Sequence, residues 1–153
     1  MQKSILTKIG EVEVSTDKDK LDIGVIHKFL STEAYWSKGI PFDIVKQAVE
    51  NSFNFGMYKG GAQIGYARII TDFTTHAYLC DVFILPEYQG NGLGKILMDE
   101  VMNEPCLANL RRWMLATSTA AGLYKKFGFT PLNKPEIFFE KHDPGVYTRD
   151  LNL

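Results

Sequence analysis

The alternation of hydrophobic and polar positions in the first half of the chain predicts one strand, two helices and a hairpin. Residues 12–17 alternate as a half-buried strand does, and residues 21–31 and 41–52 place apolar side chains at the spacing of a helix face. Residues 53–58 and 63–71 are rich in aromatic and β-branched side chains, and a short glycine-containing connection joins them. Two such runs are typical of a β-hairpin.

The second half of the chain predicts a buried central strand at residues 76–85. This run is apolar on both faces, as expected for a strand that is covered on each side, and it ends at Pro86. The further elements expected are a helix at 93–101, a strand at 111–118, a short helix at 120–127 and two weaker strands at 136–141 and 145–151. The order of elements indicates a mixed α/β domain.

Composition and charge narrow the function classes. With 153 residues, 45% of them hydrophobic, the chain can bury one core, and we expect a single domain over residues 1–153. The 17 basic and 18 acidic residues are dispersed and give a net charge of -1, so we expect no nucleic acid and no membrane as partner. Cys80 and Cys106 are too few for a disulfide framework, and no apolar stretch has the length of a signal peptide or a membrane span. These features predict a cytoplasmic protein.

A glycine-rich loop at residues 89–95 lies between the predicted central strand and the next helix. The first turn of a helix exposes unpaired backbone N–H groups, and glycines let an anion approach them, so this loop should bind an anion. It is not a Walker loop, because Gln89 and Ile96 stand where that motif has glycine and serine or threonine. A dinucleotide fingerprint is excluded because Lys95 replaces its third glycine and Arg111 stands near the place of its acidic residue.

The loop sequence Gln89-Gly90-Asn91-Gly92-Leu93-Gly94 matches the Arg/Gln-x-x-Gly-x-Gly/Ala motif of the GNAT superfamily of N-acetyltransferases. The lead-in "FILPEYQG" and the later "LYKKFGF" (residues 123–129) also resemble signatures of that family. The resemblance implies a mixed, mostly antiparallel central sheet of about six to seven strands, with helices on both faces and a splayed central strand pair. It also implies acetyl-CoA as co-substrate, a small-molecule or peptide amine as acceptor, and no metal.

Contacts to the co-substrate follow from the same resemblance. The loop backbone would hold the pyrophosphate, while Lys95 either neutralises the phosphates or faces solvent, which is the reading we favour. Amides of the splayed strand at Val82, Phe83 and Ile84 would pair with the pantetheine and polarise the thioester carbonyl. Thr117 stands where the family often has an asparagine beside the cofactor.

Tyr124 is the candidate general acid. It stands where many members of the family carry a tyrosine that protonates the departing CoA thiolate. The alternative is a core aromatic, because Phe127 follows at helical spacing and could pack beside it. We favour the acid role because the whole of "LYKKFGF" surrounds Tyr124.

Asp81 is the second candidate for the chemistry. Regular alternation places it in the same apolar layer as Leu79 and Phe83, where an ionised carboxylate needs a partner. It would either hold or deprotonate the acceptor amine, or form a structural salt bridge with Arg68 or Arg112. The residues alone leave both readings open.

Aromatic residues are the candidates for the acceptor site. In the family, the connection between the first two helices and the hairpin region line that site, which brings in Tyr35, Trp36, Tyr66 and Phe73. Aromatic faces with one acid suit a small cationic amine, although the same residues also suit ordinary packing. His76, at the start of the central strand, is a further candidate base.

Two functions from other classes stay open at this point. One is a regulatory module that binds acyl-CoA without turnover, and the other is a protein–protein adaptor in which the glycine loop is structural. The sequence also leaves open whether the chain works alone or as a homodimer.

Overall fold

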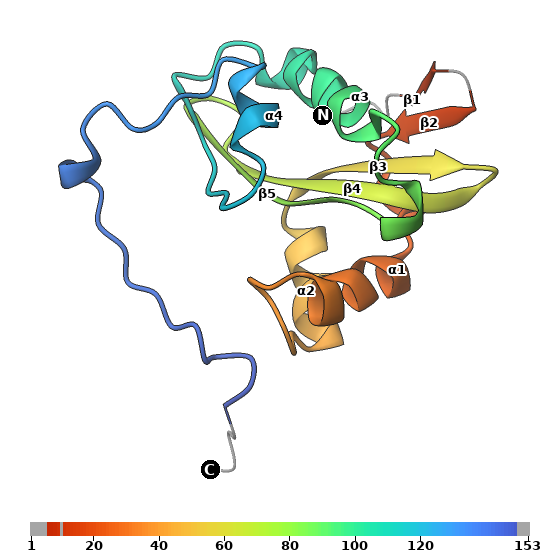
Figure 1. Cartoon of the computed structure of the whole chain (residues 1–153), viewed down its shortest axis with the longest axis horizontal. Helices are drawn as coiled ribbons and strands as arrows, with labels where there is room; N and C mark the ends of the chain where they lie inside the picture. The colour runs from red at the N-terminus through yellow and green to blue at the C-terminus, as the bar shows by residue number, and fades with distance from the viewer. Residues whose placement is uncertain (1–5, 10, 150–153) are drawn as a thin grey trace.

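The computed structural model describes residues 6–9 and 11–149, which form one twisted sheet with helices on both faces (Figure 1). Six strands lie in the order of the chain, and neighbours are antiparallel except for the parallel pair β5 and β6. The strands are β1 (Leu6–Ile9), β2 (Val12–Ser15), β3 (Phe53–Lys59), β4 (Ala62–Thr71), β5 (His76–Ile84) and β6 (Arg112–Met114). The predicted mixed, mostly antiparallel sheet is confirmed, with β1 as a strand that the pattern did not predict.

Helices cover the sheet on its two faces, as predicted. The helices are α1 (Ile23–Lys28), α2 (Phe42–Glu50), α3 (Leu93–Met102) and α4 (Ala121–Lys125), and a π-helical turn, η2 (Phe29–Glu33), extends α1. Figure 1 shows α1 and α2 on one face and α3 and α4 on the other. Within the described residues, no helix is both long and apolar enough to cross a bilayer.

Two apolar cores flank the sheet and fix which way each strand residue points. Ala67 and Ile69 of β4 belong to the core beneath α3 and α4, whereas Tyr66 belongs to the core beneath α1 and α2. All three are fully buried, at 0% exposure. Strand β4 is therefore covered on both faces, and its alternation of side chains decides what each face of the neighbouring β5 can contact.

A β-bulge interrupts β5 at the residue that matters most for the site. Tyr66 pairs with Phe83 and Arg68 pairs with Cys80, so that the single residue between them on β4 lies opposite two residues of β5. The first of these two, Asp81, has a φ of 51°, in the left-handed region that non-glycine residues rarely occupy. The bulge inserts one residue and so reverses the alternation beyond it.

The expectation that Asp81 shares an apolar layer with Leu79 and Phe83 is therefore wrong. Leu79 lies in the core beneath α3 and α4, whereas Phe83 lies in the opposite core, beneath α1 and α2. Regular alternation would have placed both on one face. The bulge between them turns the Asp81 carboxylate toward Arg68, on the α1 and α2 face.

The turn between β4 and β5 is held by a carboxylate. Asp72 accepts hydrogen bonds from the backbone N–H groups of Thr74 (3.0 Å), Thr75 (2.8 Å) and His76 (3.2 Å) and from the Thr75 hydroxyl (2.7 Å). These bonds favour the charged form and hold the pKa of Asp72 well below its ordinary value. Phe73, in the middle of the turn, has a φ of 61°.

The two strands predicted at residues 136–141 and 145–151 are not formed. The described residues from 115 to 149 contain no strand; they hold α4, the short 3₁₀ turn η5 (Pro135–Ile137) and an extended segment. This segment leaves the body beyond β6 and returns beside the loop between η2 and α2 (Figure 1). The local pattern suited a strand, but a strand also needs a neighbouring edge to pair with, and Phe139 is 93% exposed instead. Residues 150 and 151 lie outside the described part.

Candidate active site

The parallel strands β5 and β6 separate and leave a cavity between them. They pair only at residues 76–78 and 112–114, and β5 then continues to Ile84 without β6 beside it. The opening holds a cavity of about 480 Å³, which we call the splay cavity. It is lined from β5 by Tyr78, Leu79, Cys80, Asp81 and Val82, from the chain after β6 by residues 115–120, from α4 by Tyr124, and from the other face by Tyr35 and Trp36. The predicted splayed pair is thus present.

Backbone amides of β5 face this opening. The N–H of Leu85, just after β5, donates to the carbonyl of Ile64 in β4 at 2.8 Å. Because successive N–H groups of a strand point to opposite edges, those of Ile84 and Val82 point to the opened side and that of Phe83 points back to β4. The Phe83 side chain packs on Phe29, with ring centroids 4.0 Å apart. Of the three strand residues predicted to contact the cofactor, Val82 and Ile84 direct their amides to the opened side, whereas Phe83 does not.

The glycine loop follows β5 and leads into α3. Gly90 and Gly92 have φ values of 84° and 76°, which favour glycine, and a β-carbon on either would meet no atom within 4 Å. The amide group of Gln89 donates to the carbonyl of Ile84 at 2.8 Å, and that of Asn91 donates to the carbonyl of Tyr88 at 3.3 Å. The polar side chains therefore brace the loop from within and leave open space above its glycines.

The first turn of α3 meets the requirements of an anion site. Gly92 is the N-cap, and since glycine has no side chain, it cannot satisfy the N–H groups of Leu93, Gly94 and Lys95. The Lys95 ammonium lies 3.1 Å from Asp99, one turn along the helix, and the Lys95 side chain is 58% exposed. Lys95 thus points along the surface of α3, and the backbone is left as the donor set.

Tyr124 projects from α4 into the splay cavity. It is 8% exposed, and its ring meets the edge of Phe129 at a centroid distance of 6.0 Å. Burial raises the pKa of Tyr124 above its ordinary value, which keeps the phenol protonated at neutral pH. Thr117 lines the same cavity, and its hydroxyl accepts a hydrogen bond of 3.0 Å from the N–H of Ala120. Thr117 therefore shapes the entry into α4.

Asp81 is held by two donors. Its Oδ2 accepts from Nε of Arg68 at 2.7 Å and its Oδ1 accepts from Nε1 of Trp36 at 3.0 Å. The side chains of Arg68 and Asp81 are only 17% and 11% exposed, and Arg68 also donates to the Ser52 hydroxyl at 3.0 Å. The salt bridge foreseen with Arg68 is present. The alternative partner, Arg112, instead places its guanidinium 5.0 Å from the centre of the Phe138 ring.

A second cavity, of about 230 Å³, lies on the other side of Asp81 and Trp36, and we call it the helix-side cavity. Its walls are apolar residues of η2 and α2 and the strand residues Tyr66, Arg68 and Ile70. It shares Trp36, Tyr78, Cys80 and Asp81 with the splay cavity. The bonded pair of Trp36 and Asp81 therefore stands between the two spaces.

The predicted acceptor residues fall into two groups. Tyr35 and Trp36 meet edge to face at 5.1 Å, and the Tyr35 hydroxyl bonds to the Ser118 hydroxyl at 2.7 Å across the splay. Tyr66 lines the helix-side cavity but is fully buried, and its hydroxyl donates to Asn54. These three residues border the two cavities.

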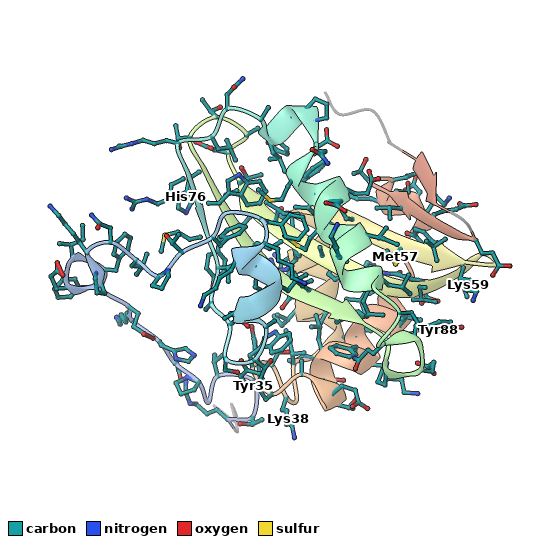
Figure 2. The ribbon with its side chains drawn as sticks, turned by 45° about the horizontal axis from the view of Figure 1, so that its top comes forward. Tyr35, Lys38, Met57, Lys59, His76 and Tyr88 are labelled. Carbon is teal, nitrogen blue, oxygen red and sulfur yellow. The ribbon has the colours of Figure 1, made fainter. Side chains whose placement is uncertain are left out.

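Phe73 and His76 do not reach either cavity. Phe73 packs on Phe53, with centroids 5.3 Å apart, in the turn before β5. His76 begins β5 and lines a shallow pocket with Thr75, Arg111 and Arg112, far from Tyr35 (Figure 2). Asp81, which borders both cavities, lies five residues further along the extended strand. His76 is therefore separated from the two cavities along β5.

Comparison with known proteins identifies the family. A model of the acetyltransferase (GNAT) domain matches residues 50–131. FG08082 of Gibberella zeae, whose name places it among acetyltransferases, is 34% identical over 138 residues, which cover 76% of this chain and 77% of that protein. The chain belongs to the GNAT acetyltransferase family.

Two solved structures agree with this assignment of the GNAT fold. A Xanthomonas campestris pv. campestris protein described as belonging to the GNAT family is 48% identical, with a TM-score of 0.89, and covers 93% of this chain and 100% of its own. A Clostridium acetobutylicum protein solved with acetyl-CoA is 20% identical, with a TM-score of 0.60, over 86% of this chain and 94% of its own. The second likeness shows the fold alone.

The GNAT motifs located the loop and Tyr124, but several cavity residues carry no such signal. Tyr78 and Cys80 share one face of β5 by regular alternation and line both cavities, but neither belongs to a motif. Tyr147 lines the helix-side cavity from the far end of the chain, which no local pattern reveals. Among the described residues, no group of three or more His, Cys, Asp or Glu side chains lies together as metal ligands would.

Proposed function

We propose that this chain is an acetyl-CoA-dependent N-acetyltransferase that transfers acetyl to the primary amine of a small molecule by direct attack in a ternary complex. The observation that carries the proposal is a single continuous site. The glycine loop with its uncapped helix, the opened edge of β5 and the buried phenol of Tyr124 follow one another along one side of the sheet. The binding of acetyl-CoA and the transfer of acetyl can therefore take place in this one site.

Acetyl-CoA is held through the backbone in this proposal. The N–H groups of Leu93, Gly94 and Lys95 take the pyrophosphate, because the helix dipole favours negative charge at that end. The N–H groups of Val82 and Ile84 face the opened edge, where the pantetheine amides would continue the sheet as an added strand does. The thioester then enters the splay cavity beside Tyr124.

The chemistry divides between the backbone and Tyr124. Attack by the amine creates a negative charge on the thioester oxygen, and a fixed N–H donor aimed at such a charge is worth about 2.7 to 4 kcal/mol. The intermediate collapses by breaking the carbon–sulfur bond, and Tyr124 gives its proton to the leaving thiolate. The attacking nitrogen loses one proton to water as the amide forms, and water returns a proton to Tyr124, so that no net proton is gained or lost by the enzyme. The raised pKa of Tyr124 keeps its proton available at neutral pH.

The charge around Asp81 bears on the acceptor. Since Arg68 lies 2.7 Å from Asp81, the pair presents no net charge to either cavity. A cationic group would find no uncompensated carboxylate there, and the apolar lining of the helix-side cavity favours an amine with an apolar body. Asp81 then serves to orient the Trp36 indole, or to relay the amine proton through water, between the two cavities.

Titration of acetyl-CoA into the wild-type chain and into Gly94→Asp tests the site. Gly94 lies in the first turn of α3, where a β-carbon meets only Leu123 at 3.7 Å, and an aspartate suits a helix N-terminus, so the variant should fold. Its charge would occupy the pyrophosphate position and weaken binding more than tenfold, or by at least about 1.4 kcal/mol. Gly94→Asn is the matched control, with the same size and no charge, and should lose less. Equal affinities for acetyl-CoA in all three folded chains would remove the loop from the proposal.

A further inference from the structure

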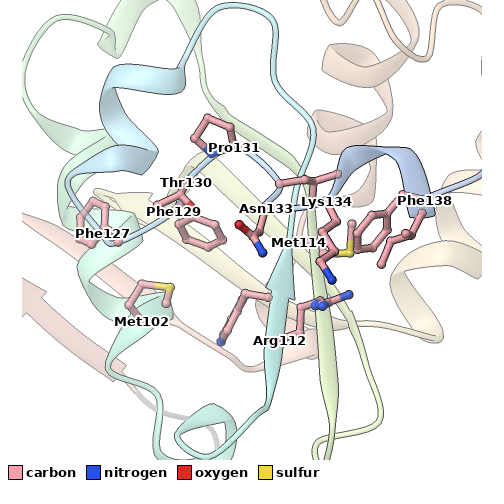
Figure 3. A pocket seen from close by; sticks show the side chains of 14 residues that line it. Met102, Arg112, Met114, Phe127, Phe129, Thr130, Pro131, Asn133, Lys134 and Phe138 are labelled. Atoms are coloured by element: carbon pink, nitrogen blue, oxygen red, sulfur yellow. The ribbon is translucent and has the colours of Figure 1, made fainter.

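The C-terminal segment, residues 130–149, runs as a strap from the edge of the sheet to the loop between η2 and α2. At its start, it borders a cavity of about 410 Å³ beside β6, where the Arg112 guanidinium lies 5.0 Å from the Phe138 ring (Figure 3). In the middle, Phe139 is 93% exposed and so contributes little packing. The two ends of the segment, not its middle, therefore hold it to the domain.

The far end of the strap is folded into a compact turn. The N–H of Val146 donates to the carbonyl of Asp143 at 3.3 Å, and the N–H of Thr148 donates to the carbonyl of Gly145 at 3.2 Å. The Arg149 guanidinium also donates to the Asp143 carboxylate. This ion pair lowers the pKa of Asp143, so the turn keeps its charge pair at neutral pH.

The turn is seated on the domain through a glycine. Gly39 has a φ of 78°, and a β-carbon there would lie 2.9 Å from Cγ2 of Thr148, closer than such atoms approach. Its N–H donates to the carbonyl of Ser31 at 3.0 Å, which fixes the loop that receives the turn. The missing side chain thus lets Thr148 come against the loop, and this contact places Tyr147 beside it.

Tyr147 brings the strap into the wall of the helix-side cavity. It lines that space together with Trp36, Arg68, Cys80 and Asp81, and it is 36% exposed, so that part of the ring faces the cavity and part faces solvent. The other lining residues come from η2, α2, the loop between them and strands β4 and β5, and Tyr147 is the contribution of the strap to the wall.

We propose that Tyr147 is a specificity-determining residue, the outer wall of the space that receives the body of the acceptor amine. The claim that Tyr147 contacts an acceptor amine rests on the acetyl transfer proposed above. The claim that Tyr147 forms a wall of the helix-side cavity does not rest on it. Replacing the ring by a methyl group would widen the helix-side cavity and admit bulkier amines. Binding of acetyl-CoA should not change, because Tyr147 does not line the splay cavity.

Cysteine labelling tests the wall without any acceptor. Cys80 lines both the helix-side cavity and the splay cavity, and burial raises the pKa of its thiol to about 12, with Asp81 adding to the effect, so it should react slowly with N-ethylmaleimide. The route through the splay cavity is the same in the wild-type chain and in a Tyr147 variant, so a change in labelling reports the helix-side cavity. Cys106 is exposed and serves as the internal reference in the same chain. Removing the Tyr147 ring lets water reach Cys80, so Tyr147→Ala should raise the ratio of Cys80 to Cys106 labelling, by about tenfold for each unit by which the pKa of Cys80 falls.

Phe139→Ala is the matched control, because it also removes an aromatic ring from the strap but lines none of the three cavities. Its labelling ratio, read by peptide mass spectrometry, should stay at the wild-type value. An unchanged ratio in Tyr147→Ala, with its circular dichroism spectrum intact, would overturn the wall.

Acetyl transfer to n-butylamine and 4-phenylbutylamine tests the specificity. Tyr147→Ala should shift the ratio of kcat/KM for these amines toward the bulkier one by about tenfold, with an unchanged Kd for acetyl-CoA. An unchanged ratio would overturn the specificity role. If the wild-type chain acetylates neither amine, the acetyl-transfer proposal loses support, and the labelling ratio alone decides whether Tyr147 is the wall.

Discussion

Breaking the ion pair of Arg68 and Asp81 should destabilise the fold more than any exposed pair of this chain would. Asp81→Ala removes the carboxylate that lies 2.7 Å from Nε of Arg68 and leaves a guanidinium whose side chain is 17% exposed. Loss of one partner of a fully buried pair costs about 3–5 kcal/mol. Arg68 keeps its bond to Ser52 and some water contact, so we expect about 2–3 kcal/mol here.

A double-mutant cycle separates the pair from its surroundings. The free energy of unfolding is measured in urea for the wild-type chain, Asp81→Ala, Arg68→Met and the double variant. The interaction energy should be about 2 kcal/mol, because the second substitution removes the charge that the first one left unpaired. The same cycle on Lys95 and Asp99, with side chains 58% and 43% exposed, is the control and should give less than about 0.5 kcal/mol. A value for Arg68 and Asp81 no larger than that of the control would refute this reasoning.

Three further results are expected. Tyr124→Phe should lower turnover about 10²-fold at unchanged affinity for acetyl-CoA. In the wild-type chain turnover should also fall at high pH, above about pH 10, as the phenol loses its proton, and this fall should be absent from the variant. Equal pH profiles of turnover would leave Tyr124 as a core aromatic. Asp72→Ala should lower Tm at pH 7, and since the pKa of Asp72 is depressed in the fold, the gap to wild type should shrink as pH falls below the unfolded value of about 3.9; a constant gap in thermal unfolding would contradict this. Asp81→Asn keeps the size and an acceptor for Trp36, so retained activity with a lower Tm would assign Asp81 to structure alone, and lost activity at unchanged acetyl-CoA affinity would assign it to the amine.

Much of the layered fold could be predicted from the sequence, because periodicity reports burial. The central strand at residues 76–84 places Leu79 in one core and Phe83 in the other, although Tyr78 is 36% exposed, so its apolar run indicated the cover only in part. The helical spacing near Leu97 and Val101 marks the buried side of α3. The glycine loop was also recognisable, since left-handed φ values at Gly90 and Gly92 require that residue type.

The orientation of Asp81 could not be predicted, because it depends on pairing between strands. A single inserted residue in β5 changes the face to which every later side chain points, and the sequence shows the insertion only as a break in an otherwise apolar run. The failure at residues 136–141 has a similar origin. Local alternation favoured a strand there, but in the described chain this segment pairs with no strand, although β6 lies at the end of the sheet.

Only some of the residues around the two cavities could be predicted from the sequence. Tyr35 and Trp36 were found because they lie between the first two helices, whereas Tyr147 reaches the same place through a long return of the chain. Contacts at such separation follow from the tertiary path, which a periodic pattern does not encode. His76 was predicted to lie near the acceptor because it is close to Asp81 in sequence. An extended strand separates residues by about 3.3 Å each, so His76 lies away from both cavities.

The central claim is that this chain moves acetyl from CoA to an amine, and release of the free CoA thiol measures that step most directly. The wild-type chain is incubated with acetyl-CoA and a panel of primary amines, and thiol release is followed together with the mass of each amine. We predict thiol release above the buffer rate with at least one amine, matched in amount by its N-acetyl product, and weaker in both Gly94→Asp and Tyr124→Phe. Binding of acetyl-CoA without thiol release to any amine would contradict the claim and identify the chain as a CoA-binding module.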